Sequence, residues 1–257
     1  MDSSETQSVH LEVNNHIAVV TLNRPPINSL VKKTYLELEK VFADIGQRQD
    51  VRVAILRSEG KFFCPGNDVS EFKKLNDGED PVAYGKAVSA GIAAVYNCKV
   101  PVVAAVHGHA YGAGMALAAA ADVMIAAEDA HFAIPEIKVG IIGAAVFLEL
   151  IVPEKVVRYM SLTGNPISAG EIAHYGGVHK VVAKEQVLDE AMIVARDLLR
   201  QSPNALRYFK EAMNINQEAR LEERYAVESG YTNRHIGSDE YLEAVNAFLE
   251  NREPVFK

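Results

Sequence analysis

The sequence lacks the features that mark secreted and membrane-spanning proteins. It has only two cysteines, Cys64 and Cys98, so we expect no disulfide framework and a reducing compartment such as the cytoplasm. The opening stretch, MDSSETQSVH, contains no apolar run of the kind found in a signal peptide. The longest apolar run, Met115–Ala121, is too short to cross a bilayer. The expectation is a cytoplasmic protein without a membrane segment.

Basic residues are in the minority. The chain has 26 lysines and arginines against 34 aspartates and glutamates, which gives a formal net charge of −8. Because nucleic acids and anionic membranes bind basic surfaces, we expect neither as a partner. An anionic ligand would need a local group of basic side chains. A length of 257 residues with 49% hydrophobic residues suits one large domain, with or without a smaller appendage.

Apolar patterns typical of strands and helices alternate along the first two-thirds of the chain. Such alternation predicts an α/β architecture, with a mostly parallel sheet covered by helices. The expected elements of this part are a hairpin of His10–Val13 and His16–Leu22 around Asn14–Asn15, strands over Val51–Arg57, Val100–Val106 and Val123–Ala127, and helices over Asn28–Gly46, Val82–Tyr96 and Gly114–Ala121.

Helical patterns dominate after Gly164. The predicted helices are Ser168–His174, Lys184–Gln201, Pro203–Asn214 and Asp239–Glu250, and the one strand expected among them is Val178–Val182. We therefore divide the chain into an α/β core over residues 1–200 and a helical C-terminal region over residues 201–257.

The segment VHGHAYGAGMALAAAADV, Val106–Val123, joins a strand to a helix through glycines and carries almost no reactive side chain. A dinucleotide-binding fingerprint has the same context, but Leu117 occupies its third glycine position and no suitable acidic residue follows. A phosphate-binding loop is excluded because no Gly-Lys-Ser/Thr is present. Two interpretations remain. The glycines allow close packing, or the free amides of a helix N-terminus bind negative charge.

An earlier loop, KFFCPGNDVSEF (Lys61–Phe72), carries a similar signal. The chain is expected to bend at Pro65–Gly66 and to expose the amide of Asn67 or Asp68. Cys64 has no neighbouring histidine, so we favour a small buried residue over a nucleophile. Two strand ends that each present a backbone N–H at the same place would form an oxyanion hole.

Five motifs together resemble the crotonase superfamily, the enoyl-CoA hydratases and isomerases. In the family's order and spacing they are NRPPINSL (Asn23–Leu30), FFCPGNDVSEF (Phe62–Phe72), VHGHAYGAGMALAAAAD (Val106–Asp122), HFAIPEIKVGI (His131–Ile141) and LTGNPISAGEIAHYGGVHKVV (Leu162–Val182). The resemblance implies repeated ββα units, a helical C-terminal trimerisation region, and a homotrimer or a dimer of trimers. It implies an acyl-CoA thioester substrate, no separate cofactor and no metal.

By position in these motifs, the amides that would hold the thioester carbonyl are those of Asn67 and Ala113. Both would act through the backbone, so Ala113 is tolerated where the family usually has glycine. The other substrate-binding positions that the resemblance implies are Arg24, Pro26, Pro65, Asp68, Val69, Tyr111, Gly112, Pro135, Phe256 and Lys257. Among them Tyr111 would line the acyl pocket, and Phe256 and Lys257 would help close a CoA site, in the same subunit or a neighbour. Arg24, Lys61 and the pair Lys73–Lys74 are candidates to meet the CoA phosphates.

Glu136 is the one carboxylate that the resemblance offers as a catalytic group. From the residues alone it is either a helix-start carboxylate after Pro135 or a functional acid, and the resemblance favours a general acid/base. Flanking Ile134 and Ile137 would raise its pKa by desolvation. The family's hydratases use a second glutamate, and this sequence has Ala116 at that position.

Moving a double bond from C3 to C2 needs only one base, so we expect a Δ3,Δ2-enoyl-CoA isomerase. A hydratase or another lyase or hydrolase of the family, and a non-catalytic acyl-CoA-binding homologue, remain alternatives. His107 and His109 would place two imidazoles on one strand face, but no third metal ligand is evident, so a structural pair is favoured.

Overall fold

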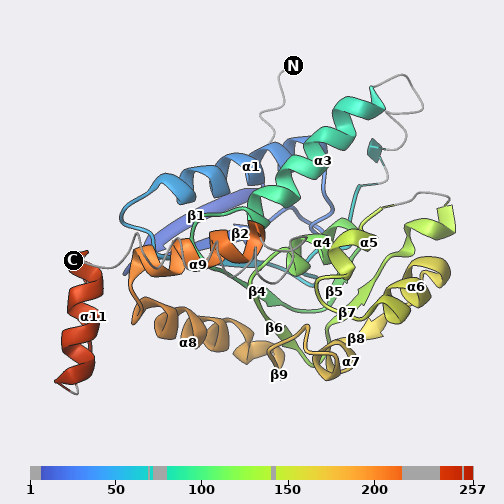
Figure 1. Cartoon of the computed structure of the whole chain (residues 1–257). Helices are drawn as coiled ribbons and strands as arrows, with labels where there is room; N and C mark the ends of the chain where they lie inside the picture. Colours follow the sequence, from blue (N-terminus) through green and yellow to red (C-terminus); the bar gives the residue numbers. More distant parts are fainter. Residues whose placement is uncertain are drawn as a thin grey trace.

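A six-stranded sheet forms the centre of the computed structural model (Figure 1), which describes residues 7–68, 70–71, 80–139, 143–215, 238–250 and 252–256. Its strand order is β1-β2-β3-β4-β6-β9, and only the pair β1 and β2 is antiparallel. The strands are β1 (Val9–Asn14), β2 (Ile17–Leu22), β3 (Val53–Ser58), β4 (Val102–Val106), β6 (Val123–Ala127) and β9 (Lys180–Val182). Every residue of β4 is buried, as expected for a parallel strand that is covered on both faces.

Helices cover this sheet from two sides. In Figure 1, α1 (Lys32–Gln47) and α3 (Pro81–Tyr96) lie side by side above the sheet. From below, α8 (Val187–Leu199) packs against β3, β4 and β6. The core between these layers consists mainly of valine, isoleucine, leucine and alanine side chains. This arrangement is the α/β architecture that the sequence predicts.

A second, three-stranded sheet has the order β5-β7-β8 and consists of β5 (His109–Tyr111), β7 (His131–Ala133) and β8 (Ile167–Ser168). Its first two strands each follow a strand of the large sheet, because β4 leads into β5 and β6 leads into β7. After β5 comes α4 (Ala113–Ala119), and after β7 comes the short 3-10 helix η1 (Pro135–Val139). These are the repeated ββα units that the family resemblance implies.

The remaining helices surround this core and occupy the C-terminal part. They are α5 (Ala145–Leu148), α6 (Glu154–Thr163), α7 (Ala169–His174), the 3-10 helix η2 (Lys184–Gln186), α9 (Pro203–Ile215) and α11 (Asp239–Leu249). A partly buried ion pair attaches α9 to the large sheet: the Nζ of the buried Lys210 lies 2.6 Å from Oδ2 of Asp122 and also donates to the Val100 carbonyl. No helix of the described part has the length and apolar character to span a membrane.

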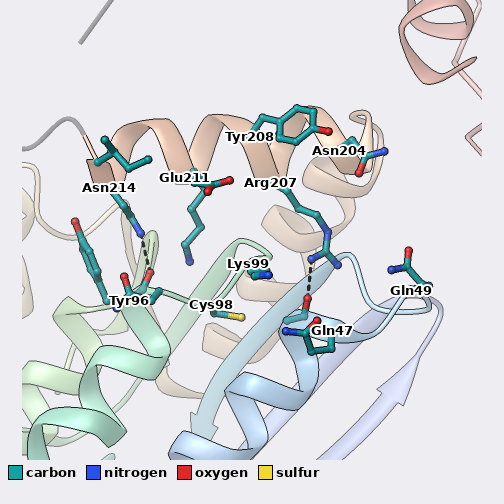
Figure 2. Close-up of a pocket in the computed structure, with 14 residues that line it drawn as sticks. Gln47, Gln49, Tyr96, Cys98, Lys99, Asn204, Arg207, Tyr208, Glu211 and Asn214 are labelled. Atoms are coloured by element: carbon teal, nitrogen blue, oxygen red, sulfur yellow. Dashed lines mark hydrogen bonds between the residues drawn. The ribbon is translucent and has the colours of Figure 1, made fainter. Parts of the chain in front are cut away.

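A pocket of about 600 Å³ lies between α9 and the C-terminal ends of α1 and α3 (Figure 2). Arg207 and Asn214 point from α9 toward these helix ends, where they donate to the carbonyls of Gly46 and Tyr96. None of the residues that the motifs single out lines this pocket. The hydrogen bonds of Arg207 and Asn214 fasten α9 to the core.

Two predicted boundaries are wrong because specific contacts fix the backbone there. The hairpin turn is not Asn14–Asn15 but Asn15–His16, whose φ angles of +47° and +66° are those of a tight two-residue loop. The helix predicted over Asn28–Gly46 begins at Lys32. Asn28 has a φ of +63°, and its side chain donates to two carbonyls of the loop after β3, which holds it outside the helix.

The expectation that His107 and His109 share one strand face is also wrong. His107 follows β4, Gly108 turns the chain with a φ of +61°, and His109 begins β5. The His107 ring hydrogen-bonds the Gly60 carbonyl, whereas the His109 ring stacks against Phe62. Among the described residues, no group of three His, Cys, Asp or Glu side chains is arranged to hold a metal ion.

Candidate active site

Three segments that are far apart in the sequence run side by side past the carboxyl ends of β3, β4 and β6. Cys64 pairs with Ala110 of β5 through an isolated bridge, and β5 in turn pairs with β7. Three residues beyond this bridge, the segment that contains Cys64 reaches Asn67 and the segment that contains Ala110 reaches Ala113. The segment after β7 reaches Glu136 within three residues of its end. The register of short strands therefore brings together the three residues that the motifs single out.

Glycines allow these segments to approach one another. A Cβ atom on Gly112 would lie only 1.5 Å from Oε1 of Glu136, so no side chain fits there. Gly112 also has a φ of +51°, a conformation that favours glycine. On the opposing loop, a Cβ on Gly66 would lie 3.7 Å from both the Ala113 nitrogen and the Glu136 Oε1. The carboxyl of Glu136 thus lies directly against the backbone that leads into Ala113.

The direction of the Asn67 N–H follows from its peptide plane. The Gly66 carbonyl accepts a hydrogen bond from Leu30 N at 2.8 Å, and Asp68 N donates to the Leu30 carbonyl at 2.8 Å. Because the peptide is planar and trans, the Asn67 N–H points away from Leu30. Among the described residues this N–H donates to no backbone carbonyl, and neither does that of Ala113, the first residue of α4. Neither amide is therefore tied to a backbone carbonyl, and the Ala113 N–H faces the Glu136 carboxyl, whose pKa it lowers.

Glu136 lies in an environment that favours its neutral form. Burial raises the pKa of its carboxyl above the ordinary value of 4.5, and the backbone N–H groups of Glu136 and Ala113 oppose this shift without cancelling it. Its Oε2 is buried and has no hydrogen-bond partner among the described residues. The expected direction of the shift is confirmed.

Two neighbouring positions carry no reactive group. Ala116, at the position where the resemblance places the hydratases' second glutamate, is fully buried in α4. Burial raises the pKa of the Cys64 thiol to about 12, so this cysteine is a protonated, buried residue and not a nucleophile. Its carbonyl would lie 2.0 Å from a Cβ on Gly114, which shows how closely α4 packs on this loop.

The Asn67 side chain has partners that the sequence does not reveal. Its Oδ1 accepts hydrogen bonds from the hydroxyls of Tyr35 in α1, at 2.5 Å, and Tyr84 in α3, at 3.0 Å. The partners are 32 and 17 residues away from Asn67 in the chain. Tyr35 contributes to the apolar helical pattern of α1, so no local signal distinguishes it from an ordinary core residue.

Two of the predicted substrate-binding residues are bonded to each other. Arg24 donates to Oδ2 of Asp68 at 2.8 Å and to the carbonyl and hydroxyl of Ser29. Burial raises the pKa of Asp68, but hydrogen bonds from Ser70, Ser29 and Arg24 outweigh it and leave this pKa well below its usual range. A pocket of about 820 Å³ adjoins this pair, and its lining includes the basic residues His10, Arg24, Lys32 and Lys33.

The other predicted binding residues lie at varied distances from Glu136. Tyr111 and Pro135 directly precede Gly112 and Glu136, and Pro65 precedes Gly66. Tyr111 is half-buried, and its ring stacks on that of His109 with centroids 4.5 Å apart. Pro26 is exposed, and the Nζ of Lys61 lies over the Phe62 ring.

Phe256 contacts Arg52 at the amino end of β3, opposite the end that leads to Asn67. Val69, Lys257 and the pair Lys73–Lys74 lie outside the described residues.

Comparison with known proteins places this geometry in a family. The family model for enoyl-CoA hydratase/isomerase matches residues 12–257. A carnitinyl-CoA dehydratase of Escherichia coli is 36% identical over 261 residues, covering 98% of this chain and 99% of the relative. The (7aS)-7a-methyl-1,5-dioxo-2,3,5,6,7,7a-hexahydro-1H-indene-carboxyl-CoA hydrolase of Mycobacterium tuberculosis is 35% identical over 216 residues, covering 84% and 87%.

Solved structures agree with these matches. An enoyl-CoA hydratase from Bacillus anthracis superposes with a TM-score of 0.89 at 30% identity, covering 98% of this chain and 99% of that chain. An enoyl-CoA hydratase from Mycobacterium smegmatis superposes with a TM-score of 0.90 at 28% identity, covering 96% and 98%. The chain has a crotonase fold and belongs to the enoyl-CoA hydratase/isomerase family of acyl-CoA-processing enzymes.

Proposed function

We propose that the protein is a Δ3,Δ2-enoyl-CoA isomerase that uses Glu136 as its single acid/base. The observation that carries the proposal is that one carboxyl lies against Gly112 and Ala113, while the position of the hydratases' second glutamate is a buried alanine, Ala116. Adding water requires a group that orients the water and moves its proton in addition to the base. Moving a double bond requires only proton removal and return.

In the proposed reaction, the N–H groups of Asn67 and Ala113 donate to the thioester oxygen of a 3-enoyl-CoA. The Glu136 carboxylate removes a proton from C2, and the electron pair of that C–H bond delocalises into a dienolate whose charge on oxygen the two amides stabilise. The protonated Glu136 then returns a proton to C4. The double bond moves from C3–C4 to C2–C3, and the carboxylate is regenerated without any other reactant.

The pocket beside Arg24 is our proposed place for the phosphates of coenzyme A, because its lining has three arginine or lysine residues against one carboxylate, Glu71, although the chain as a whole is acidic. Pro26, Pro65, Asp68, Tyr111 and Pro135 are proposed to line the path from this pocket to Glu136. A homotrimer or dimer of trimers, with Phe256 against a CoA site of a neighbouring subunit, remains a proposal drawn from the family resemblance. A location in the cytoplasm, expected from the two cysteines, also remains a proposal.

A second candidate is a reaction that adds or removes water, or hydrolyses a carbon–carbon bond. The observation that favours it is the similarity to a carnitinyl-CoA dehydratase, at 36% identity, and to a CoA-thioester-processing hydrolase, at 35% identity. Such a reaction would need an ordered water or another side chain in place of the missing glutamate.

A panel of CoA thioesters tests the two candidates against each other. The purified protein is incubated with a 3-enoyl-CoA, a 2-enoyl-CoA and a 3-hydroxyacyl-CoA of equal chain length, and the products are separated by chromatography. We expect the 3-enoyl-CoA to give the 2-enoyl-CoA, with much slower formation of the 3-hydroxy product. Rapid hydration of the 2-enoyl-CoA, or rapid dehydration of the 3-hydroxyacyl-CoA, would favour the second candidate.

The raised pKa of Glu136 predicts the pH dependence of turnover. Only the carboxylate can take the C2 proton, so activity is present above this pKa and is lost as the pH falls through it. Because burial raises the pKa, the acid limb of kcat/KM is expected to lie above the ordinary glutamate value of 4.5. An acid limb at or below that value, measured in buffers of constant ionic strength while the protein stays folded, would contradict the assignment.

A further inference from the structure

Two buried tyrosine hydroxyls hold the residue that carries the first proposed oxyanion amide. Tyr35 and Tyr84 both donate to Oδ1 of Asn67. We infer that these tyrosines are positioning residues: by fixing the Asn67 side chain, they help to aim the Asn67 N–H at the thioester oxygen. The inference rests on the proposed oxyanion hole, and it adds to that site two residues that lie outside the motifs.

The hydrogen bonds leave Asn67 little freedom. A side-chain carbonyl oxygen has two lone pairs, and each hydroxyl occupies one of them. Tyr35 is fully buried and Tyr84 is 6% exposed, so bonds to their hydroxyls are sheltered from competing water. A buried hydroxyl that loses its acceptor is unfavourable, which keeps the amide oxygen on the tyrosine side.

The tyrosines belong to the rigid part of the fold. Tyr35 lies in α1 and Tyr84 lies in the first turn of α3. The two helices pack closely at Tyr35, because a Cβ on Gly91 of α3 would lie 2.9 Å from Cδ1 of the Tyr35 ring. The packing of α1 against α3 therefore fixes the positions of both hydroxyls. Through their hydrogen bonds, the two helices hold the Asn67 side chain in place.

The tyrosines add to the backbone pairing with Leu30, which already sets the plane of the peptide between Gly66 and Asn67. Gly66 has a φ of +102° and can reach many conformations, so it does not determine the orientation of the next peptide. The pairing with Leu30 holds one side of the Asn67 backbone, and the tyrosines hold its side chain. Hydrogen bonds weaken steeply when the donor is misaligned. An oxyanion hole needs N–H donors that point at the thioester oxygen before the reaction begins.

The test replaces each hydroxyl and retains each ring. We expect Tyr35→Phe and Tyr84→Phe each to lower kcat about 10-fold and the double variant about 10²-fold, at the lower end of the effect of losing one oxyanion donor, with a smaller change in KM. The matched control is Tyr96→Phe, at the other end of α3. Its hydroxyl is buried without a partner among the described residues, so its removal should leave kcat unchanged.

A spectroscopic measurement separates positioning from general structural support. Butanoyl-CoA labelled with carbon-13 at the thioester carbonyl is bound to each variant, and the carbonyl stretch is recorded by infrared difference spectroscopy. In the wild type we expect a shift to lower frequency, because two N–H groups polarise the carbonyl. In Tyr35→Phe/Tyr84→Phe the shift should shrink, and in Tyr96→Phe it should not. The thermal midpoint is measured alongside.

The possible failures differ from one another. An equal shift in the wild type and the double variant would overturn the positioning role, even if the double variant melts earlier, and would leave the hole itself intact. Absence of a shift in the wild type would overturn both the hole and this inference. A wild type that shows the shift without isomerising a 3-enoyl-CoA would refute the proposed reaction only, and the inference would be decided by the variants' shifts.

Discussion

Glu136→Gln should abolish most turnover without weakening the fold. Glutamine has nearly the same shape but cannot take a proton from C2, and loss of a general base typically lowers the rate by about 10²–10⁴-fold. The stability should not fall, because burial raises the pKa of Glu136 and its carboxylate is therefore unfavourable in the folded state above that pKa. We expect the thermal midpoint of the variant at neutral pH to equal or exceed that of the wild type.

The measurement pairs the rate of 3-enoyl-CoA conversion with the thermal midpoint. Glu39→Gln serves as the control, because Glu39 is an exposed carboxylate on α1 and its loss should leave both quantities unchanged. Turnover by Glu136→Gln within a few fold of the wild type would remove Glu136 from the mechanism. A strongly lowered midpoint would instead show that the carboxylate supports the fold.

Gly112→Ala should be as damaging as loss of the base, although it adds only one methyl group. The new Cβ would occupy the place of Glu136 Oε1, and the φ of +51° disfavours any residue other than glycine. Both the carboxyl and the Ala113 amide would move from their positions. We expect a fall in kcat of at least about 10²-fold, the effect of losing one oxyanion donor, together with a lowered thermal midpoint.

A double variant shows whether the clash is the cause. In Gly112→Ala/Glu136→Ala the overlapping carboxyl is gone, so part of the lost thermal stability should return while turnover stays low. Gly170→Ala is the matched control, because Gly170 is exposed in α7 and a Cβ there meets nothing closer than 3.9 Å. If Gly112→Ala kept full activity, the described contact between Gly112 and Glu136 would not exist in the working enzyme.

The large sheet could be predicted from the sequence because its strands are long enough to show a pattern. The apolar runs of β3, β4 and β6 give a strand signal within their own residues. The strands β5, β7 and β8 have only two or three residues, which is too short for any periodicity. They form because pairing with distant segments holds them, and no local pattern records such pairing.

The candidate active site also combines residues that a local motif indicates with contacts between distant segments that no local pattern indicates. Asn67, Ala113 and Glu136 could be located because each lies at a fixed distance within a motif, next to a glycine or proline that shapes the backbone. The bond between Arg24 and Asp68 spans 44 positions, and nothing in either motif indicates it. Tyr35 resembles a core residue in a helical pattern, and only the packing of α1 against α3 turns its hydroxyl toward Asn67.

The most direct test of a single-base isomerase follows the proton. A 3-enoyl-CoA carrying deuterium at C2 is converted in ordinary water, and the 2-enoyl-CoA product is analysed by mass spectrometry and NMR at partial conversion. In the proposed reaction one buried carboxyl both removes and returns the proton, so we predict that part of the C2 deuterium appears at C4 of the product. A product with only solvent hydrogen at C4 would contradict transfer by one sheltered carboxyl, and 3-hydroxyacyl-CoA as the main product would contradict isomerisation altogether.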